Sequence, residues 1–201
     1  MGNNRSKSAK HVDVLPNASA KQLVQDKFIE ACRVGDVDVV RRLLRQETTI
    51  NVNQGIETFG VTALLYACQN GHAEVVALLL DEARDTIDVN QTARAGVGII
   101  GFTPLCYACS RGNVRVVNLL LDKAGDKIDI NKATETGGTP LMAAADRGYS
   151  DIVMLLLNQP GIDCNKTWTN KDGTRFTPLT RAKDLGHEAV VNLLQSHAKT
   201  S

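Results

Sequence analysis

Cys106 and Cys109 are the two residues whose spacing most resembles a chemical site. A C-x-x-C pair can act as a thiol redox centre, or as half of a zinc site when a second pair supplies the other ligands. The chain has five cysteines but no such second pair. Cys109 also shares its place in an internal repeat, described below, with Cys32 and Cys68, and the fourth copy has Ala145 there. Alternation between cysteine and alanine indicates a small buried position, so we favour packing over redox or metal chemistry.

The other ionisable residues form no catalytic constellation in the sequence. Asp36 and Asp38 lie at an expected helix start, where compensation of the helix dipole explains two carboxylates. Gly96 and Gly98 are not followed by the pattern of a phosphate-binding loop. We therefore predict a protein that is not an enzyme and has no cofactor or metal. A hydrolase or redox protein using the cysteine pair is the remote alternative.

The cysteine pair lies in residues 101–121, which read as two short helices placed back to back. Thr103 is a suitable N-cap, and Pro104 fits the first helical position because its missing N–H has no helical partner there. Gly112 is expected to end the first helix, and Asn113 to cap the second. Both helices are shorter than the roughly 12–15 residues that an isolated helix needs in water. Other parts of the chain must therefore cover their apolar faces.

Copies of the same unit supply that cover. The copies align on the glycine between the two helices, with spacings of 36, 41, 36 and 38 residues. These glycines are Gly35, Gly71, Gly112, Gly148 and Gly186. The last four copies begin with Thr62-Ala63-Leu64-Leu65, Thr103-Pro104-Leu105-Cys106, Thr139-Pro140-Leu141-Met142 and Thr177-Pro178-Leu179-Thr180. The first four copies each end in a short β-like stretch that closes on Asn53, Asn90, Asn131 or Asn165.

Through these motifs the chain resembles the ankyrin-repeat family, whose unit runs Thr-Pro-Leu-His, two alanines, Gly-His, a helix with Val-Val and Leu-Leu-Leu, and Asp-Val-Asn. The resemblance covers about residues 19–198. It implies that His72 and His187, which follow inter-helix glycines, are structural braces. The histidine after Thr-Pro-Leu is absent from every copy, which implies a less regular array. The residues at that position are Leu65, Cys106, Met142 and Thr180.

The expected fold is all-α: an ankyrin-repeat solenoid of about five helix-turn-helix units with hairpin-like linkers, spanning residues 19–201. The units are expected near 19–53, 54–90, 91–131, 132–165 and 166–198. The first helix should run to about Val34 as a terminal cap. We expect its apolar residues to face inward and its polar residues, Gln25 among them, to face outward. The inward residues are Leu23, Phe28, Ile29 and Ala31.

The composition is that of a folded protein, with 43% hydrophobic and 22% charged residues. A net charge of +1 gives no large electrostatic field, which argues against nucleic acid as the partner. No apolar run is long enough to span a membrane, and no signal-peptide core is present near the start. We expect a cytoplasmic monomer.

Residues 1–18 are polar and aperiodic, and we expect a flexible basic tail there. The opening Met-Gly-Asn-Asn-Arg-Ser matches the N-myristoylation pattern, with Gly2 as the acceptor. A single myristoyl chain supports only reversible membrane binding. Two interpretations stay open: an acylated protein with peripheral membrane contact, or a chain that begins with Met-Gly by chance.

The resemblance implies a binding surface on the concave face, where the linkers and first helices lie. The linkers here are long and unusually apolar, and one of them carries the single tryptophan, a residue type enriched at binding hot spots. We predict a non-enzymatic interaction module, or adaptor, that binds a partner protein on this face. The alternatives are a myristoylated, membrane-tethered scaffold and a host-targeted effector using the same face. The expected partner-binding residues are Phe59, Gln69, Asn70, Ile99, Ile100, Phe102, Ser110, Arg111, Asp146, Arg147, Trp168 and Phe176.

Overall fold

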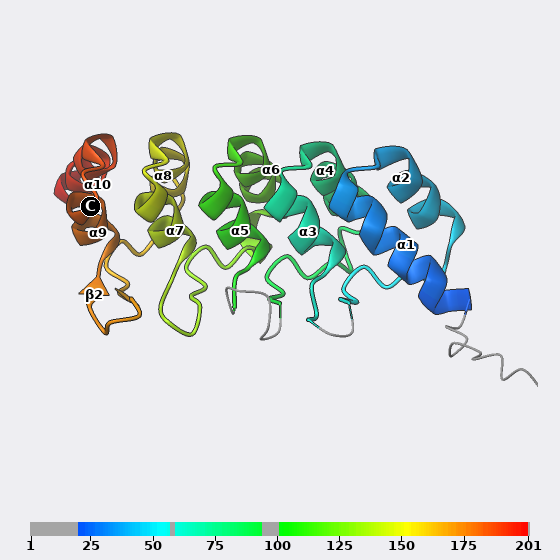
Figure 1. Cartoon of the computed structure of the whole chain (residues 1–201). Helices are drawn as coiled ribbons and strands as arrows, with labels where there is room; N and C mark the ends of the chain where they lie inside the picture. The colour runs from blue at the N-terminus through cyan, green and yellow to red at the C-terminus, as the bar shows by residue number, and fades with distance from the viewer. Residues whose placement is uncertain (1–19, 57–58, 94–100, 201) are drawn as a thin grey trace, which may run out of the picture.

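A computed structural model of the chain describes residues 20–56, 59–93 and 101–200. Helical pairs follow one another in single file along this part of the chain (Figure 1). The elements are α1 (Ala20–Val34), α2 (Val37–Gln46), α3 (Ala63–Asn70), α4 (Ala73–Glu82), α5 (Pro104–Arg111), α6 (Val114–Ala124), the 3₁₀ turn η1 (Gly125–Lys127), α7 (Pro140–Arg147), α8 (Ser150–Leu157), β1 (Trp168–Thr169), β2 (Arg175–Phe176), α9 (Pro178–Asp184) and α10 (Glu188–Thr200).

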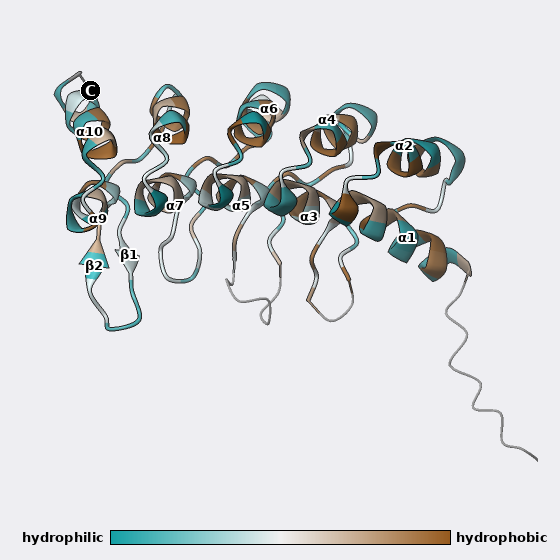
Figure 2. Ribbon diagram, turned by 45° about the horizontal axis from the view of Figure 1, so that its top comes forward, coloured by the Kyte–Doolittle hydropathy of each residue, from teal (hydrophilic) through white to brown (hydrophobic). Residues whose placement is uncertain are grey.

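The helices form two parallel rows. The odd-numbered helices make one row and the even-numbered helices make the other, while the linkers project from the odd-numbered row (Figure 2). Each helix packs mainly on its pair mate and on the same-row helix of the neighbouring pair. This arrangement confirms the expected all-α solenoid. We call the surface made by the odd-numbered helices and the linkers the linker side.

Local sequence determines where α3, α5 and α7 begin and end, and where α9 begins. The hydroxyl of Thr103 accepts a hydrogen bond from the Cys106 amide at 3.1 Å, and Thr139 does the same for Met142 at 3.1 Å. Thr62 and Thr177 cap their helices in the same way. Gly112 ends α5 with φ at +74°, a left-handed conformation that glycine adopts without a steric cost. The predicted start and end of α5 are therefore confirmed.

Apolar side chains from both rows form the core between successive pairs. Leu79, Val117, Leu120 and Leu156 on the even-numbered helices have no exposed surface. The small residues on the odd-numbered helices, such as Ala108, are equally buried and allow these helices to lie close together. Each pair therefore buries apolar surface only by contact with its neighbours, as a solenoid requires.

Asparagines in the turns that follow α2, α4 and α6 link each unit to the next. The Asn131 side chain donates to the Gly161 carbonyl at 2.7 Å and accepts from the Asp163 amide at 2.9 Å. Asn53 and Asn90 make the same pair of bonds to the units that follow them. The β-like stretches expected at these asparagines are wrong: the chain forms turns there, and the polar groups pair through side chains rather than through a strand ladder.

A second set of joints lies at the turns between paired helices. The His72 ring covers Gly35, where a Cβ atom would lie 2.6 Å from Nδ1, and its Nε2 is 2.9 Å from the Arg33 carbonyl oxygen. His187 covers Gly148 in the same way. The expected bracing role of both histidines is thus confirmed.

Asn113 and Tyr149 occupy the same place in the two central units. Asn113 Nδ2 donates to the Cys68 carbonyl at 2.9 Å, over Gly71, and the Tyr149 ring lies over Gly112. The prediction that the Asn113 side chain caps α6 is wrong, since that side chain makes no capping hydrogen bond. Its amide reaches the preceding unit instead.

The first helix differs from its expected orientation at two residues. Phe28, Ile29 and Ala31 are buried as expected, but 67% of Leu23 is exposed. Gln25 is 3% exposed, although a polar outward position was expected. Its amide group bonds both the carbonyl and the amide of Asn51, at 2.9 and 3.0 Å. These bonds satisfy the polar atoms that burial removes from water.

Candidate functional site

A pocket of about 420 Å³ opens on the linker side between the third, fourth and fifth units. We call it the linker-side pocket. Aromatic and small apolar groups supply much of its lining, and polar side chains stand among them. The lining residues are Phe102, Ser110, Thr134, Glu135, Thr136, Gly138, Met142, Ala143, Asp146, Arg147, Trp168, Thr169, Asn170 and Lys171.

One wall of the linker-side pocket is the hairpin of β1 and β2. Trp168 pairs with Phe176 across the two strands, and their ring centroids are 6.1 Å apart. The hairpin turn is closed by Asn170, whose side chain accepts from the Thr174 amide at 2.9 Å. This two-stranded sheet is the one regular hairpin among the residues that the structure describes.

The hairpin is attached to the linker of the preceding unit. The Thr169 amide donates to the Thr136 carbonyl at 2.9 Å. Gly137 permits this approach, since its φ is +88° and a Cβ atom there would lie 2.1 Å from the Thr167 carbonyl oxygen. The two linkers therefore form a continuous wall across the joint between units four and five.

Arg181 fixes the hairpin to α7. Its guanidinium lies 5.4 Å from the Trp168 ring centroid and 5.1 Å from that of Phe176, within cation–π range. Its Nε is 2.6 Å from Asp146 Oδ1, and another guanidinium nitrogen is 2.9 Å from Asp184 Oδ2. Only 20% of the Arg181 side chain is exposed. Arg181 thus holds Trp168 in place and pairs with a carboxylate in the pocket wall.

The remaining expected binding residues are distributed along the linker side. Phe102 packs edge-on against Tyr107, with centroids 5.2 Å apart, and the Ser110 hydroxyl donates to the Tyr107 carbonyl. Phe59 is half-buried against a small cluster containing Val61 and Tyr107. Arg111 and Arg147 are exposed on the ends of α5 and α7.

The structure brings five of these expected residues together around the linker-side pocket. They are Phe102, Ser110, Asp146, Arg147 and Trp168. Phe176 lies behind Trp168, while Gln69 and Asn70 lie on α3, outside the pocket. The Asn70 side chain donates to the Arg33 carbonyl at 2.8 Å, so it also joins two units. Gly2, Ile99 and Ile100 are outside the described residues.

Two residues at the site, Arg181 and Lys171, were not predicted from the sequence. Lys171 could have been found from the hairpin signal, because Asn170 and Gly173 are turn formers between two short stretches with aromatic residues. Arg181 gives no local signal, since its partner Asp146 is 35 residues away.

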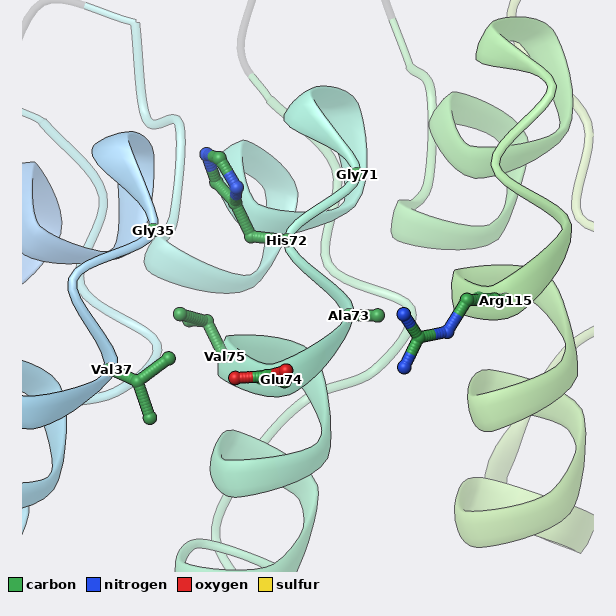
Figure 3. Close-up of a pocket in the computed structure, with 8 residues that line it drawn as sticks. All are labelled: Gly35, Val37, Gly71, His72, Ala73, Glu74, Val75 and Arg115. Carbon is green, nitrogen blue, oxygen red and sulfur yellow. The ribbon is translucent and has the colours of Figure 1, made fainter.

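A second, smaller pocket of about 230 Å³ lies at the turns between paired helices near the first three units (Figure 3). Its side chains include His72, Glu74 and Arg115, and the Arg115 side chain extends from α6 toward Ala73 (Figure 3). His72 already packs over Gly35 and contacts the Arg33 carbonyl oxygen. The lining of the smaller pocket contains no Phe, Tyr or Trp, whereas that of the linker-side pocket contains Phe102 and Trp168. The linker-side pocket is therefore the candidate site.

Four of the five cysteines are buried and carry free thiols. Burial raises the pKa of Cys106 to about 11, and also raises the pKa of Cys32, Cys68 and Cys109. These groups therefore remain protonated thiols at neutral pH, whereas thiol chemistry needs the thiolate. Within the described ranges, no cluster of three or more histidine, cysteine or carboxylate residues is placed to hold a metal ion.

Among the residues that the structure describes, no helix is both long enough and apolar enough to cross a membrane.

The family model for ankyrin repeats (3 copies) matches residues 28–134, 88–167 and 126–201. Human short transient receptor potential channel 3 is 33% identical over 170 residues, which is 77% of this chain and 13% of that protein. The rat and mouse proteins of the same name are 39% identical over 56 residues, or 28% of this chain and 6% of each protein. The chain therefore spans only a small part of these relatives.

Proposed function

Because the chain belongs to the ankyrin-repeat family, we propose that it is a non-enzymatic adaptor that binds a partner protein on its linker side. Ankyrin repeats generally mediate protein–protein interaction. We place the contact at the linker-side pocket. We also propose that the protein acts in the cytoplasm as a monomer.

The observation that carries this proposal is the placement of Trp168. The ring lines a pocket of about 420 Å³ and is held on its other side by Phe176 and Arg181. A rigid, part-exposed aromatic group loses little conformational freedom on binding and buries a large apolar area. Polar and charged side chains surround it, which matches the usual arrangement of an apolar centre and a polar rim in protein interfaces.

Replacing Trp168 with serine tests the proposal. We expect the Trp168→Ser variant to lose partner binding by about 30-fold or more, the effect of removing a hot spot worth about 2 kcal/mol. The measurement is cross-linking and capture of partners from cells that express tagged wild-type or variant protein, followed by titration of a captured partner. Helical content is checked by circular dichroism.

Met154→Ser is the matched control, because Met154 is an exposed apolar residue of α8, in the row away from the linkers. It should bind the partner like the wild type. Equal binding by the Trp168 variant, or an equal loss in the Met154 variant, would show that the linker-side pocket is not the contact.

The N-terminal motif supports a second proposal, a membrane-tethered scaffold. If translation starts at Met1, Gly2 becomes the acceptor for a myristoyl group once the methionine is removed. Arg5, Lys7 and Lys10 would add about 1 kcal/mol each of attraction to an anionic membrane surface. Mass spectrometry of the mature N-terminus in a eukaryotic host tests this, with Gly2→Ala as the control. An unmodified Gly2 would exclude the tether but leave the adaptor proposal intact. A host-targeted effector would use the same binding face.

A further inference from the structure

The apolar part of the linker-side pocket has the size and chemistry to hold one large side chain. Its volume of about 420 Å³ lies within the range of about 300–1,000 Å³ found for ligand pockets. Phe102, Met142 and Trp168 come from three different units and enclose it with Ala143. Aromatic pairing with Trp168 or Phe102 would favour an aromatic occupant.

The charges around the pocket favour an acidic partner. The carboxylate of Asp146 is paired with Arg181 at 2.6 Å, and the same guanidinium also pairs with Asp184 at 2.9 Å. Arg147 is 61% exposed, and its Nε is 3.9 Å from Asp146, too far for a hydrogen bond. Lys171 is also exposed and has no hydrogen-bonded or ion-paired partner among residues 20–56, 59–93 and 101–200. Both cations are therefore available at the pocket. Of the two carboxylates in its lining, Asp146 is paired with Arg181, which leaves Glu135 as the one without a partner among the described residues.

The hairpin segment extends this positive rim. Residues 166–176 contain Lys166, Lys171 and Arg175, and their one acidic residue is Asp172. The Asp172 carboxylate accepts two bonds from Thr174, at 2.9 and 2.6 Å, and these bonds lower its pKa. The Asp172 carboxylate is thus hydrogen-bonded within the turn, while the side chains of Lys166, Lys171 and Arg175 are exposed. Arg111, on α5 beside Ser110, adds a further exposed cation on the same side.

We propose that the linker-side pocket recognises a peptide segment of the partner in which a large aromatic side chain is flanked by acidic residues. The aromatic group enters between Trp168, Phe102 and Met142, and the acidic groups reach Arg147 and Lys171. This assignment rests on the proposed function and adds the chemistry of the partner. Complementary charges at the rim would mainly set the choice of partner and the rate of association.

Labelled synthetic peptides test the assignment. Three peptides with one glycine–serine background carry, at the centre, phenylalanine between two pairs of glutamates, alanine between the same glutamates, or phenylalanine between two pairs of lysines. Fluorescence anisotropy with the full chain should show the first peptide binding at least about 10-fold more tightly than the other two, a difference of about 1.4 kcal/mol. The same comparison is made in parallel with a random peptide display library.

Two variants connect the result to the pocket. Ala143→Leu fills the pocket without removing a core side chain, and it should weaken the first peptide about 10-fold or more. Arg147→Glu combined with Lys171→Glu should reverse the preference toward the lysine-flanked peptide. Arg42→Glu, on the exposed surface of α2, is the matched charge control and should bind as the wild type does. Circular dichroism verifies that each variant is folded.

Several outcomes would overturn the assignment. These are equal binding of the alanine or lysine peptide, binding of none of the three, or selection from the library of peptides without acidic neighbours. Binding only after a serine in the peptide is phosphorylated, or binding of single-stranded nucleic acid instead, would also overturn it. The adaptor proposal is judged separately by partner capture with the Trp168 variant, so it can survive each of these results.

Discussion

Leu120→Ala should lower the free energy of unfolding by about 2–5 kcal/mol, the range found when a buried leucine is truncated. Leu120 has no exposed surface and lies in α6, the middle helix of the even-numbered row. The neighbouring helices α4 and α8 both pack on α6. The truncation therefore removes apolar contacts within the unit and at both of its joints, and it leaves a cavity that the surrounding helices can fill only in part.

Urea unfolding followed by circular dichroism measures this effect. Leu23→Ala is the matched control, since it is the same change at a residue that is 67% exposed. We expect the control to shift stability by no more than about 0.5 kcal/mol. Similar losses in the two variants would contradict the proposed packing of the solenoid.

Gly148→Ala should destabilise the protein by about 2–5 kcal/mol, the sum of a backbone cost and a packing cost that can be measured separately. Gly148 has φ at +73°, a left-handed conformation that costs a residue with a Cβ atom about 1–2 kcal/mol. The new Cβ atom would also lie 2.7 Å from His187 Nδ1, so the ring must move and its brace on the Asp146 carbonyl must loosen. Overpacking of this kind costs about 1–3 kcal/mol.

Gly186→Ala separates the two contributions. Its φ is +72°, nearly equal to that of Gly148, but no atom lies within 4 Å of the new Cβ position. Its loss in stability should be only the conformational cost. A double variant, Gly148→Ala with His187→Ala, should show coupling, because removing the ring removes the overlap. If the two glycine variants lose equal stability, the histidine does not brace the joint.

Much of the fold could be predicted because its signals are local. Thr103 and Gly112 start and end α5 through bonds within a few residues, so the sequence alone identifies them. The repetition of these signals at similar spacing then predicts the neighbours that bury each apolar face. The asparagine turns were misread as strands, since their bonds to the next unit are not visible within one repeat.

Local patterns failed where a residue's environment depends on another unit. Leu23 lies near the start of α1 and is mostly exposed, whereas Gln25 is buried because Asn51 offers it two hydrogen bonds. The pattern of polar and apolar residues in one helix contains no information on such a partner. Arg181 is a similar case, since its role depends on Asp146 in the preceding unit and on two rings of the hairpin.

The positions of the aromatic residues were predictable in part. Trp168 could be predicted as a binding residue because it is the single tryptophan and lies in a linker rich in turn formers. The linker sequence does not show that Phe102 and Met142, from two other units, line the same pocket. These three residues lie close together because of the distance between successive units, which depends on the packing of the odd-numbered helices.

The asparagine joints have a consequence for how such a chain can change in length. Each joint bonds a side chain to the backbone of the following unit, and Asn53, Asn90 and Asn131 repeat this geometry. No central volume has to be filled, in contrast to a closed core of fixed capacity. A whole module could therefore be duplicated or deleted during evolution with its connectors still matched, and the array would grow or shrink without being redesigned.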